Sequence, residues 1–127
     1  MERAIELYAC IQFVVIGLSH LLQPRAWVEF FVLLRAKGHA GVFANAFLSL
    51  LFGSLIVSFH NVWTGWAMVL TLLGWAQVFK ATMHFILPQI GMRGMQRVAI
   101  ERAWEFQAAG IFFLVLAGVM GIVLVRV

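Results

Sequence analysis

Several residue types that support common enzyme chemistries are scarce or missing in this chain. It contains no aspartate, and all five of its acidic residues are glutamates. Its one cysteine, Cys10, excludes a disulfide within the chain and argues against a cysteine-based metal cluster. The sequence also lacks a P-loop, a dinucleotide-binding glycine motif and a serine nucleophile elbow. We therefore predict no catalytic residues, and the sequence favours a protein that is not an enzyme.

Charged side chains are also scarce, at 11% of the residues, whereas 64% of the residues are hydrophobic. A soluble domain of 127 residues has too little interior to hide so much apolar surface. Continuous apolar runs favour helices over barrel strands, which would alternate between apolar and polar residues. Residues 1–127 are thus predicted to form one all-α domain, an integral membrane four-helix bundle. Since about 20 apolar residues cross a bilayer, the predicted spans are 4–22, 40–59, 66–87 and 103–125.

The connections between these spans differ in character. Pro24 ends the first span and Pro88 ends the third, because proline cannot continue a helix. Arg25–Arg35 is too short to cross a membrane and carries apolar residues at helical spacing, so it is predicted to be a short interfacial helix. Residues 89–102 are predicted to form a loop and a second short surface helix. No internal repeat is evident in the sequence.

One part of the sequence resembles a known pattern. It comprises His60-Asn61-x-Trp63, Thr71-x-x-Gly74-Trp75, Lys80 and Pro88, and covers mainly residues 55–88. Small, uncharacterised bacterial and archaeal integral membrane proteins share this pattern, together with four spans and a lysine in the third. The chain departs from the pattern at Ala81, where a glycine usually follows the lysine. Because that family has no assigned activity, the resemblance implies only the fold and the positions of the motif.

The distribution of basic residues predicts the orientation. The first and third connections carry six bases, whereas Arg3 and Arg126 lie on the opposite side. The positive-inside rule therefore places both termini outside the cytoplasm of a bacterial inner (plasma) membrane. The net charge of +4 follows this topology and does not indicate nucleic-acid binding. The expected partners are membrane lipid, other membrane subunits and further copies of the chain. The six bases are Arg25, Arg35, Lys37, Arg93, Arg97 and Arg102.

Polar side chains inside the spans are informative because they are expensive in hydrocarbon. Helical spacing places those of each span on one stripe, which should face the interior of the bundle. Glu6 and His60, near the outer ends, are predicted to form a hydrogen-bonded outer pair. Lys80 and Glu105 are predicted to form an ion pair. Simple packing between helices is the alternative interpretation of these polar groups. The predicted inner cluster consists of His20, Asn45, Gln77, Lys80, His84 and Glu105.

No metal site and no cofactor are predicted. His20 and His84 lie at similar depths on different spans, so axial ligation of haem b is geometrically possible. The sequence contains no Cys-x-x-Cys-His or His-x-x-x-His motif that would support it.

Three functions stay open at this point. The favoured one is a non-catalytic accessory or assembly subunit of an inner-membrane complex. The second is a small oligomeric transporter or channel that carries an ion or proton past Lys80, His84 and Glu105. The third is a membrane redox subunit associated with quinone or haem near His20 and His84.

Overall fold

The chain is all-α, with four long apolar helices, as predicted. The computed structural model describes residues 1–126, and the four long helices are long and apolar enough to cross a membrane. The predicted short helix after the first span is confirmed as α2, and the second short helix as α5. The elements are α1 (Glu2–Leu22), α2 (Pro24–Ala36), α3 (His39–Phe59), α4 (Met68–Ile86), α5 (Pro88–Gln96), a 3-10 turn η1 (Ile100–Arg102) and α6 (Trp104–Val125).

The two prolines set the ends of four of these helices. Gln23 and Leu87 each leave the helical conformation, with φ/ψ of −129°/53° and −125°/75°. A residue that precedes proline is pushed out of the α region by the proline ring, which explains why α1 and α4 stop there. Pro24 and Pro88 then begin α2 and α5, where a missing backbone N–H costs nothing because the first turn leaves it unpaired.

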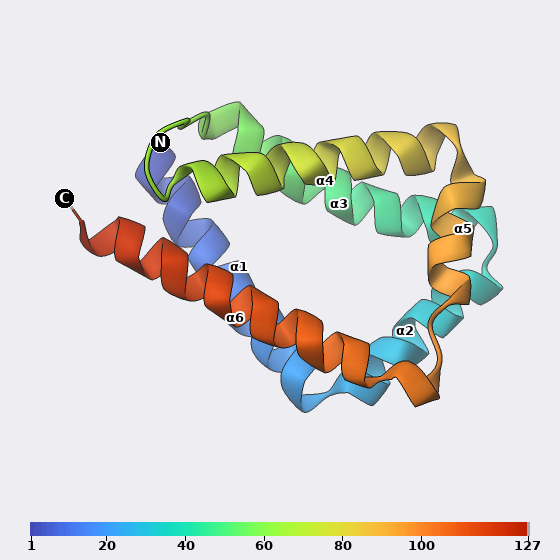
Figure 1. The fold of residues 1–127 in the computed structure, drawn as a ribbon. Helices are drawn as coiled ribbons and strands as arrows, with labels where there is room; N and C mark the ends of the chain where they lie inside the picture. The colour runs from blue at the N-terminus through green and yellow to red at the C-terminus, as the bar shows by residue number, and fades with distance from the viewer. Residues whose placement is uncertain (127) are drawn as a thin grey trace.

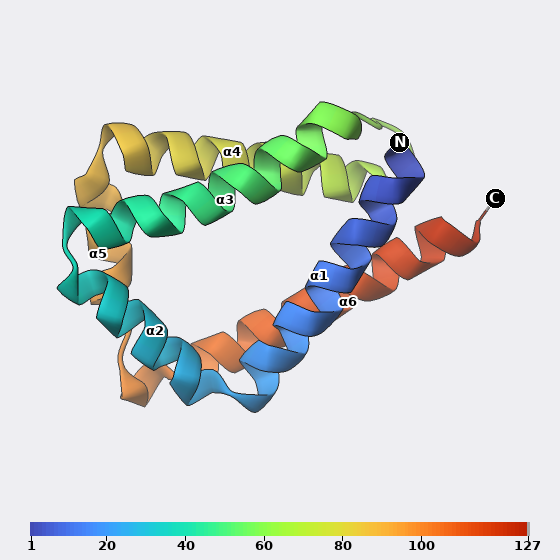
Figure 2. The same ribbon diagram turned by 180° about the vertical axis from the view of Figure 1, so that it is seen from behind.

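The helices form the three sides of a triangle (Figures 1 and 2). Helix α1 packs along α6, and α3 packs along α4. These two pairs meet near the N-terminus and diverge toward α2 and α5, which pack on each other and form the third side. We call the meeting point the terminal end, since both chain termini lie there, and the side made by α2 and α5 the basal end.

The terminal end holds the main hydrophobic core. All four long helices contribute to it, and its fully buried members include Ala9, Ile56 and Leu70. A smaller cluster of Leu34, Val42 and Met95 joins the helices of the basal end. The middle of the triangle, between these two clusters, is the part of the molecule where the helix pairs stand apart.

Within each pair, glycines allow very close approach. A Cβ atom added at Gly110 of α6 would lie 2.7 Å from the carbonyl oxygen of Gly17 in α1. One added at Gly53 of α3 would lie 2.8 Å from the carbonyl oxygen of Gly74 in α4. Small residues at such positions let helix backbones approach in a membrane, where packing drives association.

The two halves of the chain have the same order of helices, a correspondence that we call the internal repeat, although no repeat is evident in the sequence. The halves α1–α2–α3 and α4–α5–α6 share the order long, short, long, and each short helix begins with proline. In this order α1 corresponds to α4, α2 to α5, and α3 to α6. The pair α1–α6 then corresponds to the pair α4–α3, which is the relation that a two-fold rotation would produce. In the views of Figures 1 and 2, the first half forms one layer of the triangle and the second half forms the other.

Contacts in one helix pair correspond to contacts in the other pair when residue numbers are shifted by the distance in sequence from Pro24 to Pro88, which is 88 − 24 = 64 residues. The Cys10 thiol donates a hydrogen bond to the carbonyl of Ala117, and the residues at the same offset, Gly74 and Gly53, touch in the other pair. Buried residues also correspond, for example Ile56 with Met120. Few identical residues survive because lipid-facing positions accept almost any apolar side chain, which hides the repeat in the sequence.

Candidate functional site

The space between the helix pairs contains three adjoining hollows, which together we call the wedge cavity. Their volumes are about 230, 440 and 260 Å³. Lys80 lines the first and the second, while Phe31 and Phe106 line the second and the third. The first hollow lies between the two halves of the repeat. Its lining includes three pairs of corresponding residues: Phe13 with Gln77, Ile16 with Lys80, and Ser49 with Phe113.

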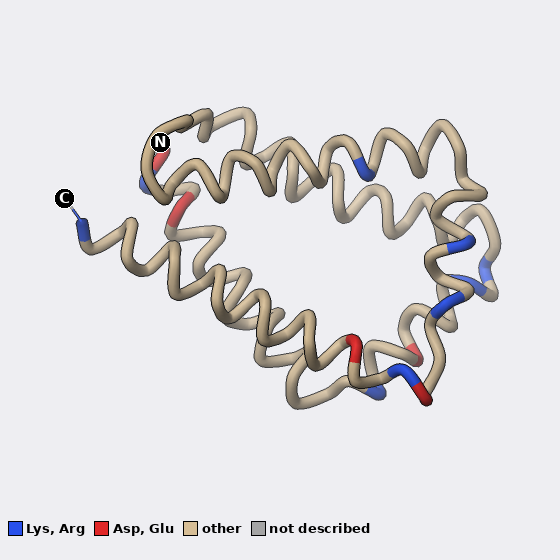
Figure 3. The backbone as a smooth tube through the Cα atoms, viewed as in Figure 1, with Lys and Arg blue, Asp and Glu red and all other residues tan. Residues whose placement is uncertain are grey.

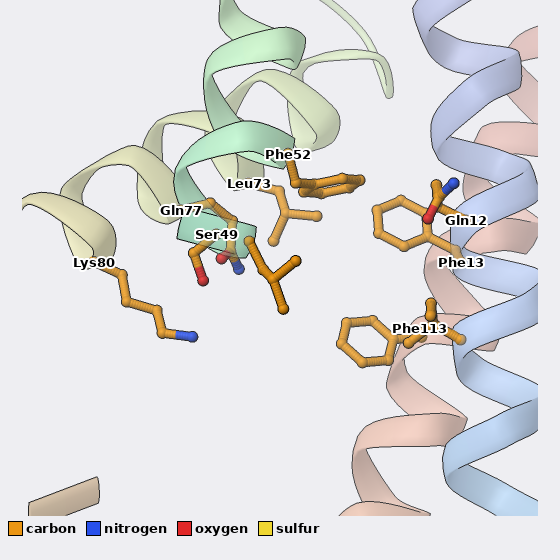
Figure 4. A pocket seen from close by; sticks show the side chains of 10 residues that line it. Gln12, Phe13, Ser49, Phe52, Leu73, Gln77, Lys80 and Phe113 are labelled. Atoms are coloured by element: carbon orange, nitrogen blue, oxygen red, sulfur yellow. The ribbon is translucent and has the colours of Figure 1, made fainter. Parts of the chain in front are cut away.

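Lys80 is the most unusual residue of this cavity. It is the only lysine or arginine in α4, about two turns before the end of that helix. Its side chain extends from α4 into the space between the helix pairs, beside Gln77 and Ser49 (Figure 4). Among residues 1–126, no hydrogen-bond or ion-pair partner holds its ammonium group.

The predicted ion pair between Lys80 and Glu105 is wrong. Glu105 lies in the first turn of α6, and its Oε1 accepts a hydrogen bond from Arg97 Nη2 at 2.8 Å. Arg97 lies in the short connection just before α6, so its long side chain reaches the carboxylate over a few residues of chain. Lys80 lies across the wedge cavity and lines hollows that do not include Glu105.

Two more members of the predicted cluster lie near Lys80. Asn45 and His84 line the second hollow with it. His84 Nδ1 is buried without a hydrogen-bond partner among the described residues. A Cβ atom added at Gly91 would lie 3.3 Å from the His84 ring, so glycine is what lets α5 pass so close. This side of the cavity thus collects Lys80, His84, Asn45 and Gln77.

His20 has a different environment. It lines the third hollow, its Nδ1 lies 2.8 Å from the carbonyl oxygen of Ile16, and its ring stacks on Trp27 with centroids 4.1 Å apart. Trp27 in turn donates a hydrogen bond to Ser19 Oγ at 2.9 Å. His20 therefore helps to fasten α2 to α1. The structure divides the predicted cluster between the first two hollows, where Gln77, Lys80, Asn45 and His84 lie, and the third, where His20 and Glu105 lie.

The outer pair is confirmed. Glu6 Oε2 and His60 Nε2 are 2.9 Å apart at the terminal end, and both side chains are buried. Sequence analysis missed the third member, Thr71, whose hydroxyl lies 2.9 Å from His60 Nδ1. Thr71 belongs to the Thr-x-x-Gly-Trp motif, and this motif was the one feature of the sequence that could have pointed to it. These three residues, which we call the terminal triad, join α1 to the end of α3 and to α4.

The terminal triad admits two arrangements of protons. The Thr71 hydroxyl donates to the carbonyl of Val62 at 2.8 Å, so its oxygen accepts the proton of His60 Nδ1. His60 Nε2 then either donates to an ionised Glu6 or accepts from a protonated Glu6. Both arrangements satisfy every buried polar atom of the triad, which explains how ionisable residues are tolerated there.

The basal end concentrates basic residues (Figure 3). Arg35 Nη1 donates toward the carbonyls of Met95, Gln96 and Val98 at 3.1–3.3 Å, and so fastens α2 to the chain at the end of α5. Arg102 donates to the carbonyl of Arg97 and lines the third hollow with it. The third hollow is therefore lined by both arginines and by Glu105, the ion-pair partner of Arg97.

Among residues 1–126, no group of three or more His, Cys, Asp or Glu side chains is placed to hold a metal ion. Comparison of the chain with protein-family models, with curated proteins and with solved structures finds no match. The resemblance of residues 55–88 to the small four-span family is thus supported only in its four long apolar helices, and the family is not identified.

Proposed function

We propose that this chain is a non-catalytic accessory subunit of a bacterial inner-membrane complex, and that it acts by holding an anionic guest in the wedge cavity. By guest we mean a molecule or a segment of another chain that bears negative charge. The observation that carries the proposal is the ammonium group of Lys80, which points into the cavity with no partner from residues 1–126.

The energetics support a guest. Lys80 is exposed in the isolated chain, and a lone charge within the membrane would cost at least about 2.5 kcal/mol, so such a charge is retained where something compensates it. The nearby Nδ1 of His84 also lacks a partner. An incoming anion could pair with the ammonium group and accept hydrogen bonds from the amides of Asn45 and Gln77, which line the same hollows.

The position of the cavity gives independent support. Transport proteins built from structural repeats place their binding sites at the interface between the repeats. The first hollow lies at such an interface and draws residues from all four long helices.

Lys80→Met is expected to abolish retention of the guest, because methionine replaces most of the stem without the charge. The test is purification from the native membrane in mild detergent, followed by identification of bound small molecules and co-purifying chains. Lys37→Met is the matched control, since Lys37 is exposed in the turn after α2. We expect Lys80→Met to be as stable as the parent chain or more stable, since it removes a desolvation cost. A parent chain that retains no anionic guest would overturn the proposal, and so would equal retention by Lys80→Met.

We further propose that the basal end faces the cytoplasm. Its connections carry six lysines and arginines, whereas the terminal end carries Arg3 and Arg126. The positive-inside rule then places both termini outside. A phosphatase that is active only outside the cytoplasm should therefore be active when it is fused to the C-terminus. A fluorescent reporter that matures only in the cytoplasm should be dark at the same site, and the opposite pattern would show the reverse orientation.

A further inference from the structure

The wedge cavity is chemically divided in a way that indicates what its guest is. We infer that the guest is a single-chain anionic amphiphile taken up from the bilayer, with an oxyanion head at Lys80 and a hydrocarbon tail in the first hollow. The inference rests on the proposed function and adds the chemical class of the guest.

The first hollow provides the division between head and tail. Its polar groups lie on the α3–α4 side around Lys80, with Gln77 and Ser49 beside it (Figure 4). Toward α1 and α6 the lining becomes aromatic and aliphatic, with Phe13 and Phe113 facing Phe52. Gln12 is the one polar side chain on the α1 side of this hollow. A small inorganic anion would use the ammonium group and leave the apolar wall without an occupant.

The size of the hollows also suits an amphiphile. The hollows of about 230 and 260 Å³ are each smaller than most pockets that hold small organic ligands, whereas the hollow of about 440 Å³ is within the usual range. Lys80 lines both the first and the second hollow, so an anion bound to it stands at the junction between them.

A membrane amphiphile can enter from the side. Helices α1 and α3 make few contacts with each other, and the strong contacts of the long helices are those within the two pairs. The three hollows between the pairs also open outward rather than being enclosed. A lipid-soluble tail needs no aqueous path to reach the first hollow.

A spanning helix from a partner protein fits less well. Such a helix is about 10 Å wide along its whole length. The terminal end is closed by the terminal triad and the hydrophobic core, and the basal end is closed by the contact of α2 with α5. The cavity therefore narrows where a helix would have to continue.

The inference is tested with the full chain in detergent, using stearic acid as the probe and native mass spectrometry as the measurement. Stearyl alcohol supplies the same tail without charge, and acetate supplies the same head without a tail. We expect one stearate per chain, and weak binding of the other two probes. A charged hydrogen bond of about 1.5–3 kcal/mol converts to a roughly ten- to hundredfold loss of stearate affinity in Lys80→Met. Lys80→Arg keeps the positive charge and should therefore retain most of the stearate affinity of the parent chain.

A second pair of variants tests the tail. Ser49→Phe places an aromatic side chain in the first hollow and should reduce stearate binding while leaving Lys80 in place. Ser58→Phe is the control, since Ser58 lies exposed on the same helix. The melting temperature of each variant must match that of the parent chain for its binding to be compared.

Three outcomes overturn the inference. One is equal binding of stearic acid and stearyl alcohol, and another is acetate binding as tight as stearate binding. The third is an acidic partner chain that co-purifies in place of a lipid and is lost from Lys80→Met. That third result leaves the proposed function standing, whereas a parent chain without any anionic guest removes the proposed function itself.

Discussion

Gly110→Leu is expected to destabilise the protein by about 3 kcal/mol, at the upper end of the usual cost of overpacking. The reason is the close contact between α1 and α6. A Cβ atom at Gly110 would lie 2.7 Å from the Gly17 carbonyl oxygen and 2.8 Å from the Leu21 nitrogen. Both are backbone atoms, so the clash is relieved only by moving one helix away from the other.

The same helix offers a matched control. An added Cβ at Gly118 meets nothing within 4 Å, so Gly118→Leu should change stability little. Both substitutions exchange a glycine for a leucine within α6, so the gain in helix propensity is shared and cancels in the comparison. Thermal unfolding in detergent, followed by circular dichroism, measures the difference. Equal melting temperatures for the two variants would show that α1 and α6 do not approach each other at Gly110.

The terminal triad should show strong coupling between Glu6 and His60. Either Glu6→Leu or His60→Leu alone leaves a buried polar group without its partner, which costs about 1–3 kcal/mol or more if the remaining group is charged. The double variant should be close to the parent chain in stability, because it removes both groups together. The internal repeat supports this choice of substitution, since the corresponding residues in the second half are Leu70 and Leu124.

A double-mutant cycle in detergent provides the measurement. Thermal unfolding of the parent chain, the two single variants and the double variant gives the coupling energy directly. We expect the destabilisation of the double variant to be clearly smaller than the sum of the two single effects. Simple additivity would mean that the contact between Glu6 and His60 contributes nothing to holding α1 against α3.

The spans were predictable because apolar length decides them, and no observed helix end differs from the predicted bound by more than two residues. Glu6 and His60 were predictable for a related reason, since two buried polar groups at one depth have few other partners. The partner of Glu105 was not predictable from the sequence. Choosing between Lys80 and Arg97 depends on which base the folded connection brings near, and helical spacing within the spans carries no information about that.

The divergence of the two helix pairs could also not be predicted from the sequence. Every long helix carries apolar residues around most of its surface, since lipid and protein neighbours both accept them. Periodicity therefore shows which residues are polar, but it does not show whether four helices close around one axis or pack as two separate pairs. That distinction depends on where glycines such as Gly17 and Gly110 meet.

The repeat also explains why a single charge can occupy the middle of this molecule. If the chain were two identical halves, a lysine at the position of Lys80 would be duplicated, and two ammonium groups would face each other and repel. Joining two unequal halves in one polypeptide breaks that constraint. Ile16 occupies the corresponding place in the first half. The cavity thereby has a positive wall and a neutral wall, so the proposed guest would meet different chemistry at its two ends and would have one preferred direction of binding.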